Sequence, residues 1–143
     1  VGRATLYRYF ASVEAILLAW HERLIESHLR ELTAARDQAD TALERLVAVL
    51  DAYAQMSHEH HGSEMAAMLH RGAHVARARH VLLSFVRDLL VDAAKAGEVR
   101  RDVAPAELAS YCLHALEAAA TMPSKAAVRR LVEVVVTGIQ TRR

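Results

Sequence analysis

The chain has 143 residues, of which 53% are hydrophobic and 24% charged, with only five glycines and two prolines. That length suits one domain, and so few turn-forming residues argue against disorder, collagen-like repeats and a β-sandwich. The formal net charge of +1 indicates neither a nucleic-acid partner nor an acidic one. No uncharged run approaches the roughly 18 residues of a membrane span, and the single Cys112 cannot form an internal disulfide. With no export signal in the sequence, we expect a cytoplasmic protein.

Apolar residues recur at helical spacing along most of the chain. The pattern predicts helices over residues 12–35, 41–61, 63–71, 75–96, 105–121 and 125–140. Ser12 and Ser124 suit the N-cap position of the first and last helix, Pro105 suits a first helical turn, and Gly97 marks a helix end. No alternating run is long enough to indicate a strand. We therefore predict a single all-α helical bundle.

The first ten residues carry two arginines and no acid. Leu6 and Phe10 are four positions apart, so they share one face of a helix and suit packing inward. The remaining surface offers guanidinium and hydroxyl donors of the kind that contact phosphates and base edges in a major groove. These donors are Arg3, Thr5, Tyr7, Arg8 and Tyr9. Taken as residues alone, the segment is equally consistent with an ordinary surface helix.

The order of these residues closely resembles the recognition helix of the tetracycline-repressor (TetR) family of transcriptional regulators. The motif consists here of Arg3, Thr5-Leu6-Tyr7-Arg8-Tyr9-Phe10, Ser12 and Glu14-Ala15-Ile16. Residues 97–109 also resemble the family's link between its third-last and second-last helices. Gly2, Ala11 and Val13 depart from the family pattern, which often has Ser or Thr, Pro or Gly, and Lys at those positions.

The resemblance implies that residues 1–11 are the recognition-helix remnant of a helix-turn-helix, because the family's first two helices are not in this sequence. Residues 12–143 would then form a helical ligand-binding and dimerisation domain. The implied function is a DNA-binding transcriptional regulator, most simply a repressor, that a small and largely apolar effector releases from operator DNA. The DNA contacts implied are Arg3, Thr5, Tyr7, Arg8 and Tyr9.

A regulator of this kind needs a pocket that is mostly apolar with a few polar groups. The candidates are large apolar residues, and polar residues that lie on apolar helix stripes. They are Trp20, Leu24, His28, Tyr53, Met56, Met65, Met68, Leu69, Phe85, Leu89, Tyr111, His114 and Glu117. Each of the apolar ones suits ordinary core packing as well.

The predicted last helix is apolar around most of its circumference, which indicates burial on two sides. In the TetR family the last two helices of each protomer form a four-helix dimer interface, so the resemblance implies a homodimer with two-fold symmetry. The candidate interface residues are Leu108, Leu116, Leu131, Val135, Gly138 and Ile139.

Nine histidines raise a competing hypothesis, a stand-alone helical protein that binds a metal or a small molecule and no DNA. Three of them cluster at residues 58–61, and His70 and His74 have the i, i+4 spacing of zinc ligands on a helix, although Gly72 lies between them. We expect a solvated histidine-rich surface, no metal and no cofactor.

The sequence has no nucleophile elbow, Gly-rich phosphate loop or His-Glu-x-x-His motif, so we expect no enzymatic activity.

Overall fold

The computed structural model describes residue 2, residues 13–60 and residues 73–142. The elements in chain order are α2 (Val13–Asp37), α3 (Ala42–Glu59), α5 (Ala73–Lys95), α6 (Pro105–Glu117), the 3₁₀ helix η1 (Ala118–Thr121) and α7 (Lys125–Ile139). The all-α prediction is confirmed, since the described ranges contain an isolated bridge but no strand. The predicted helix over residues 63–71, Ser12 and residues 3–10 lie outside the described residues.

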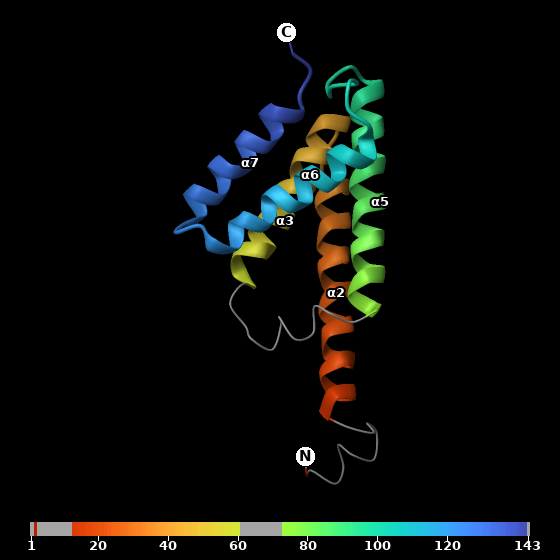
Figure 1. Ribbon diagram of the computed structural model, residues 1–143, viewed down its shortest axis with the longest axis vertical. Helices are drawn as coiled ribbons and strands as arrows, with labels where there is room; N and C mark the ends of the chain where they lie inside the picture. The colour runs from red at the N-terminus through yellow and green to blue at the C-terminus, as the bar shows by residue number, and fades with distance from the viewer. Residues whose placement is uncertain (1, 3–12, 61–72, 143) are drawn as a thin grey trace.

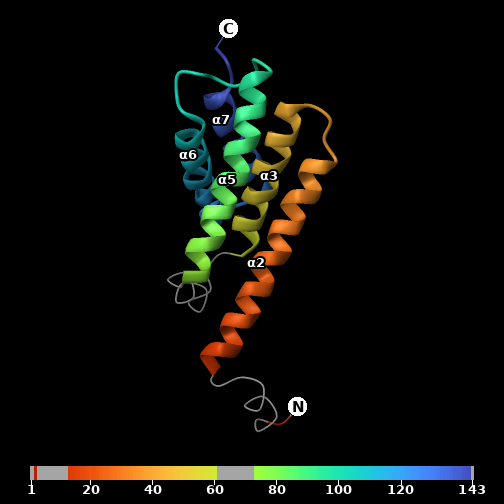
Figure 2. The ribbon, with the colours of Figure 1, turned by 90° about the vertical axis from the view of Figure 1, so that its right-hand side faces the viewer.

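α3 lies at the centre of the bundle and packs against α2, α5, α6 and α7. α2, α3 and α5 run side by side along the long axis of the molecule, while α6 crosses them and α7 lies on the outside (Figures 1 and 2). The first turns of α2 extend beyond the other helices (Figures 1 and 2). No helix within residues 13–60 and 73–142 is long and apolar enough to cross a membrane.

The core is formed by apolar side chains at helical spacing on α3, α5, α6 and α7. Its largest fully buried members are Leu46, Leu50, Val49, Val86, Leu90, Val99, Leu113, Leu116, Val128, Val135 and Ile139. Burying one such side chain stabilises the fold by about 1.5–3 kcal/mol. α2 lies at the edge of this core and contributes only Leu32 to its buried cluster.

The ends of the helices follow local chemistry. Thr41 and Glu44 form a capping box at the start of α3: the Thr41 hydroxyl accepts from the Glu44 N–H at 3.2 Å, and the Glu44 carboxylate accepts from the Thr41 N–H at 3.0 Å. Ser124 caps α7 as predicted, since its hydroxyl accepts from the Ala127 N–H at 3.1 Å. Gly97 follows α5 with a φ of 79°, a left-handed conformation that favours glycine.

The loop between α5 and α6 is joined to the C-terminal end of α7. Val99 and Gln140 form an antiparallel bridge, and the Arg100 N–H donates to the Ile139 carbonyl at 2.9 Å. The Arg100 guanidinium also binds both carboxylate oxygens of Asp102, at 2.7 and 2.6 Å. These bonds hold the two ends of the α6–α7 segment together.

Four residues predicted to contact a second subunit are instead buried inside their own protomer. Leu108, Leu116, Val135 and Ile139 are between 0% and 5% exposed, because α6 and α7 turn them into the core cluster. A side chain that its own chain already covers adds no area to a dimer. Of the other two candidates, Leu131 is half-buried and Gly138 is exposed.

Candidate ligand-binding site

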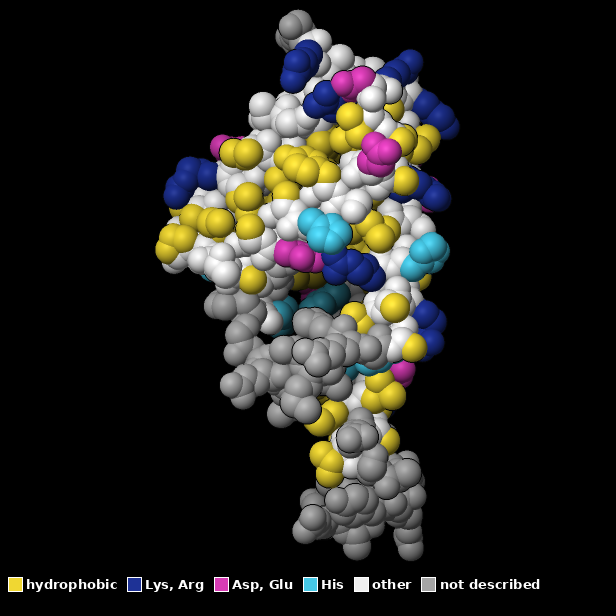
Figure 3. Space-filling view, in the orientation of Figure 1, with side chains coloured by type: hydrophobic (Ala, Val, Ile, Leu, Met, Phe, Trp, Pro, Cys, Tyr) yellow, Lys and Arg dark blue, Asp and Glu magenta, His cyan; other side chains and the backbone are white. Residues whose placement is uncertain are grey.

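A cavity of about 780 Å³ lies between α2, α3, α5 and the C-terminal end of α6. Its volume is within the range of small-molecule sites, roughly 300–1,000 Å³. The lining residues are Trp20, His21, Leu24, Ile25, His28, Leu29, Leu32, Tyr53, Met56, Ser57, Glu59, His60, Val75, Ala78, Arg79, Leu82, Leu113, Glu117 and Ala120. In Figure 3 the surface is hollowed beside a group of basic, acidic and histidine side chains.

Several of the predicted pocket residues line this cavity: Trp20, Leu24, His28, Tyr53, Met56 and Glu117. The first three are four positions apart, so they project from one face of α2, toward the gap between α3 and α5. Met65, Met68 and Leu69 lie outside the described residues. Arg79 also lines the cavity, although its sequence neighbours gave no sign of this, because an arginine among polar residues is typical of a solvated side chain.

Four predicted pocket residues lie elsewhere. Leu89 is 6% exposed and belongs to the core, and Phe85 packs against the core with the Arg36 guanidinium 5.2 Å from its ring centre. Tyr111 is 46% exposed on the outer side of α6. His114 is exposed as well, and its Nε2 is bonded to Arg79, which lines the cavity.

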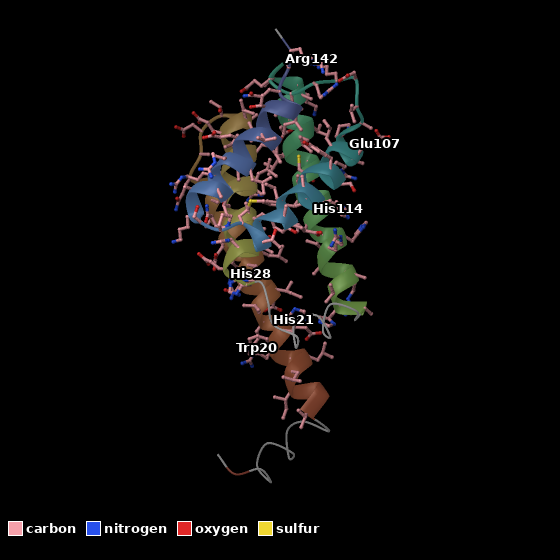
Figure 4. All side chains as sticks on the ribbon, turned by 60° about the vertical axis from the view of Figure 1, so that its left-hand side comes forward. Trp20, His21, His28, Glu107, His114 and Arg142 are labelled. Atoms are coloured by element: carbon pink, nitrogen blue, oxygen red, sulfur yellow. The ribbon has the colours of Figure 1, made fainter. Side chains whose placement is uncertain are left out.

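A pair of histidines links α2 to α5 beside the cavity. His21 Nδ1 and His74 Nε2 are 2.9 Å apart, and the rings meet edge to face. His21 is only 6% exposed, and Figure 4 places it on the side of α2 that faces α5. A hydrogen bond between two imidazoles needs one bare ring nitrogen, so the doubly protonated pair could not keep this bond.

A second pair of histidines joins α2 to the end of α3. The ring centres of His28 and His60 are 4.8 Å apart. Burial lowers the pKa of His28 first, and the neighbouring His60 lowers it further, whereas the carboxylates of Glu31 and Glu59 act in the opposite direction. The net lowering keeps the His28 imidazole neutral to a lower pH than a solvated histidine.

Arg79 connects α5 to α6 at the cavity wall. Its Nη2 donates to the Glu117 carboxylate and to His114 Nε2, both at 2.9 Å. Since Nε2 accepts, the proton of a neutral His114 is on Nδ1, which donates to the Ser110 carbonyl at 2.8 Å. Burial raises the pKa of the nearby Tyr53 hydroxyl and the Glu117 carboxylate raises it further, while Arg79 opposes both.

The described residues contain no built metal centre. Within residues 13–60 and 73–142, no three His, Cys, Asp or Glu side chains are placed to hold an ion. His58 Nδ1 lies 3.0 Å from the Ala119 carbonyl, and His61 and His70 lie outside the described residues. Cys112 is fully buried, and burial raises the pKa of its thiol to about 12.

Comparison with known proteins places this fold among regulators. Residues 14–141 match a family model described as the C-terminal domain of SbtR-like transcriptional regulators. No curated protein sequence matches the chain significantly.

Several solved structures share the fold. The superantigen PfiT is 22% identical with a TM-score of 0.79 over 98% of this chain and 79% of its own. The ketosteroid transcriptional regulator KstR2 of Mycobacterium tuberculosis is 19% identical with a TM-score of 0.69, over 99% and 80%. The TetR-family regulator SCO4454 of Streptomyces coelicolor is 19% identical with a TM-score of 0.70, over 97% and 74%. Since the family model spans almost the whole chain, the protein belongs to the TetR family of transcriptional regulators, and residues 14–141 are its SbtR-like C-terminal domain.

Proposed function

We propose that the protein is a ligand-responsive, DNA-binding transcriptional repressor whose effector occupies the cavity and releases operator DNA. The main support for this proposal is that α2 connects the cavity to the segment that resembles a recognition helix. The middle of α2 lines the cavity, and its first residue, Val13, directly follows the segment that resembles a recognition helix. An occupant that favours one position of α2 over another shifts the balance between DNA-competent and DNA-incompetent states by its difference in affinity for them.

The effector is small and largely apolar. Most of the side chains around the cavity are aliphatic or aromatic, and burying apolar surface supplies most of the affinity at such a site. Polar contacts that orient the effector come from the cavity-lining histidines, from Tyr53 and from the bonded pair Arg79 and Glu117. These histidines are His21, His28 and His60. The proposal needs no catalytic step and no cofactor.

DNA recognition is assigned to residues 1–11, and ligand binding and dimerisation to residues 12–143. The base and phosphate contacts proposed are Arg3, Thr5, Tyr7, Arg8 and Tyr9, which lie outside the described residues. Their support is the order of the motif and the donors it presents. Two recognition helices of a symmetric dimer would read half-sites about one helical turn apart.

The homodimer is proposed to form through the outer faces of α6 and α7. Val134 is 66% exposed and Tyr111 is 46% exposed there, and Leu131 and Val136 are half-buried beside them. Tyr111 also covers Gly138, where a Cβ would lie 3.4 Å from the tyrosine hydroxyl. This apolar outer face fits an isologous contact.

Sedimentation velocity tests the dimer. Val134→Lys should convert the dimer to monomer, because a lysine there would be desolvated against its own copy. The matched control is Val81→Lys, which changes a 50% exposed valine on α5 away from this face and should leave the dimer intact. Equal sedimentation of both variants as dimers would reject the α6–α7 interface.

Fluorescence anisotropy tests DNA binding, with the DNA that flanks the protein's own gene and at stated salt. The chain should carry the two helices that precede the recognition helix in the family. Arg8→Ala or Tyr7→Ala should each cost about 1–3 kcal/mol of operator affinity, whereas Arg87→Ala, an exposed residue on α5, should not. Unchanged operator affinity in both recognition-helix variants would refute the assignment.

A further inference from the structure

Among the described residues, the charged side chains that line the cavity are two carboxylates, Glu59 and Glu117, and one guanidinium, Arg79. Arg79 is already bonded to Glu117 at 2.9 Å. None of the ion pairs found within residues 13–60 and 73–142 includes Glu59. When the histidines are neutral, the wall therefore carries a net negative charge centred on Glu59.

The carboxylates Glu59 and Glu117 act on two half-buried groups that line the cavity. At Tyr53 on α3, the Glu117 carboxylate opposes ionisation more strongly than Arg79 favours it. At His28 on α2, burial and the neighbouring His60 lower the pKa, and the Glu31 and Glu59 carboxylates offset that lowering only in part. His28 therefore stays neutral to a lower pH, and a cation supplied by a ligand would be stabilised by Glu59 and Glu117.

The backbone and the aromatic side chains add to this preference. The last turn of α3, which ends at Glu59, borders the cavity through Met56 and Ser57, and the carbonyl end of a helix carries partial negative charge. The positive end of α5 contributes only Val75 from its first turn. Trp20 and Tyr53 also line the cavity, and aromatic ring faces attract cations and repel anions.

We infer that the effector is a lipophilic cation, an apolar body that carries an ammonium or similar positive group placed at the Glu59 end of the cavity. The inference rests on the proposed function and specifies the chemical class of its ligand. His28 is suited to this role because a neutral imidazole accepts a hydrogen bond from an ammonium and adds no repulsion.

Three probes with the same apolar tail separate charge from hydrophobicity: decylammonium, decanol and decanoate, each at about pH 7 and below its aggregation concentration. Trp20 is the single tryptophan and lines the cavity, so its fluorescence reports occupancy, with calorimetry as a second readout. The cation should bind about tenfold more tightly than decanol, and added salt should reduce that advantage.

Two charge-neutralising variants test whether the preference for the cation depends on Glu59. Glu59→Gln should weaken binding of the cation several-fold, roughly three- to tenfold, and leave decanol unchanged. The control is Glu22→Gln, which neutralises an exposed glutamate on α2 that does not line the cavity. Decanol or decanoate binding as tightly as the cation, or a Glu59→Gln variant with unaltered cation affinity, would overturn the inference while leaving the cavity as an effector site. If none of the three probes binds, the proposed function fails at the cavity itself.

Discussion

Replacing Ala78 by leucine should fill part of the cavity and stabilise the protein. Ala78 is half-buried on α5 and lines the cavity, so the larger side chain can extend into space that none of the described residues fills. The change adds roughly three methylene equivalents, each contributing about 0.8 kcal/mol when buried, or about 2 kcal/mol in total. For a chain of this length that raises the melting temperature by about 4–8 °C.

The assay is thermal unfolding followed by circular dichroism, at one fixed protein concentration because an oligomer's stability depends on it. The matched control is Ala93→Leu on the same helix, since Ala93 is fully buried in the packed core. There the same added group should destabilise by about 1–3 kcal/mol through overpacking. Ala78→Leu should also weaken binding of the decyl probes. A destabilised Ala78→Leu, comparable to Ala93→Leu, would mean that the cavity is not open space.

Three further experiments test a helix cap, an ion pair and a buried thiol. Thr41→Ala removes one half of the capping box and should lower the free energy of unfolding in urea by about 1 kcal/mol; an unchanged midpoint would contradict the cap. The Arg100 guanidinium lowers the pKa of Asp102 to about 2 from an unfolded value of 3.8, so this contribution to stability is complete above pH 3.8 and is lost as the pH falls toward 2. Arg100→Ala should remove that step from the acid-unfolding profile, and an unaltered profile would count against the ion pair. Because burial raises the pKa of Cys112 to about 12, the thiol should react with Ellman's reagent at about pH 8 only after unfolding; fast labelling of the folded protein would show that it is accessible.

The helices were predictable because their boundaries depend on local chemistry. The predicted ends lie within two residues of those in the structure, apart from the end of α6. There the predicted helix ends at Thr121, whereas α6 ends at Glu117 and the next four residues form η1. Residues 118–120 are alanines and give no stop signal. The change from an α-helix to the tighter 3₁₀ helix has a local cause in Pro123. This proline favours an extended conformation at Met122, which has φ −71° and ψ 144°.

The cavity was less predictable because periodicity identifies the inner face of a helix and leaves open which helix that face meets. Trp20 and Leu24 were predicted as large apolar residues, and His28 was predicted as a polar residue on an apolar stripe. Leu89 has the same apolar character but meets the core. The role of Arg79 depends on partners 35 and 38 residues further along the chain, a distance over which sequence spacing says nothing about contact. Four of the interface candidates are buried in their own protomer for the same reason, since apolar spacing does not tell a residue that faces the core from one such as Val134, which is exposed on α7.

Because α2 is long and straight (Figures 1 and 2), a small tilt of the helix moves its N-terminal end further than the part that lines the cavity. Its C-terminal half is anchored in the bundle, with Leu32 only 2% exposed, whereas Val13 at its N-terminal end is 54% exposed. At about 1.5 Å per residue, Val13 lies about 36 Å from Asp37, and the cavity-lining Ile25 lies about 18 Å from it. A tilt of α2 about its anchored end therefore moves Val13 about twice as far as Ile25. A displacement of one bond length at the cavity becomes a shift of about 3 Å where the helix meets residues 1–12, which is the span of a hydrogen bond.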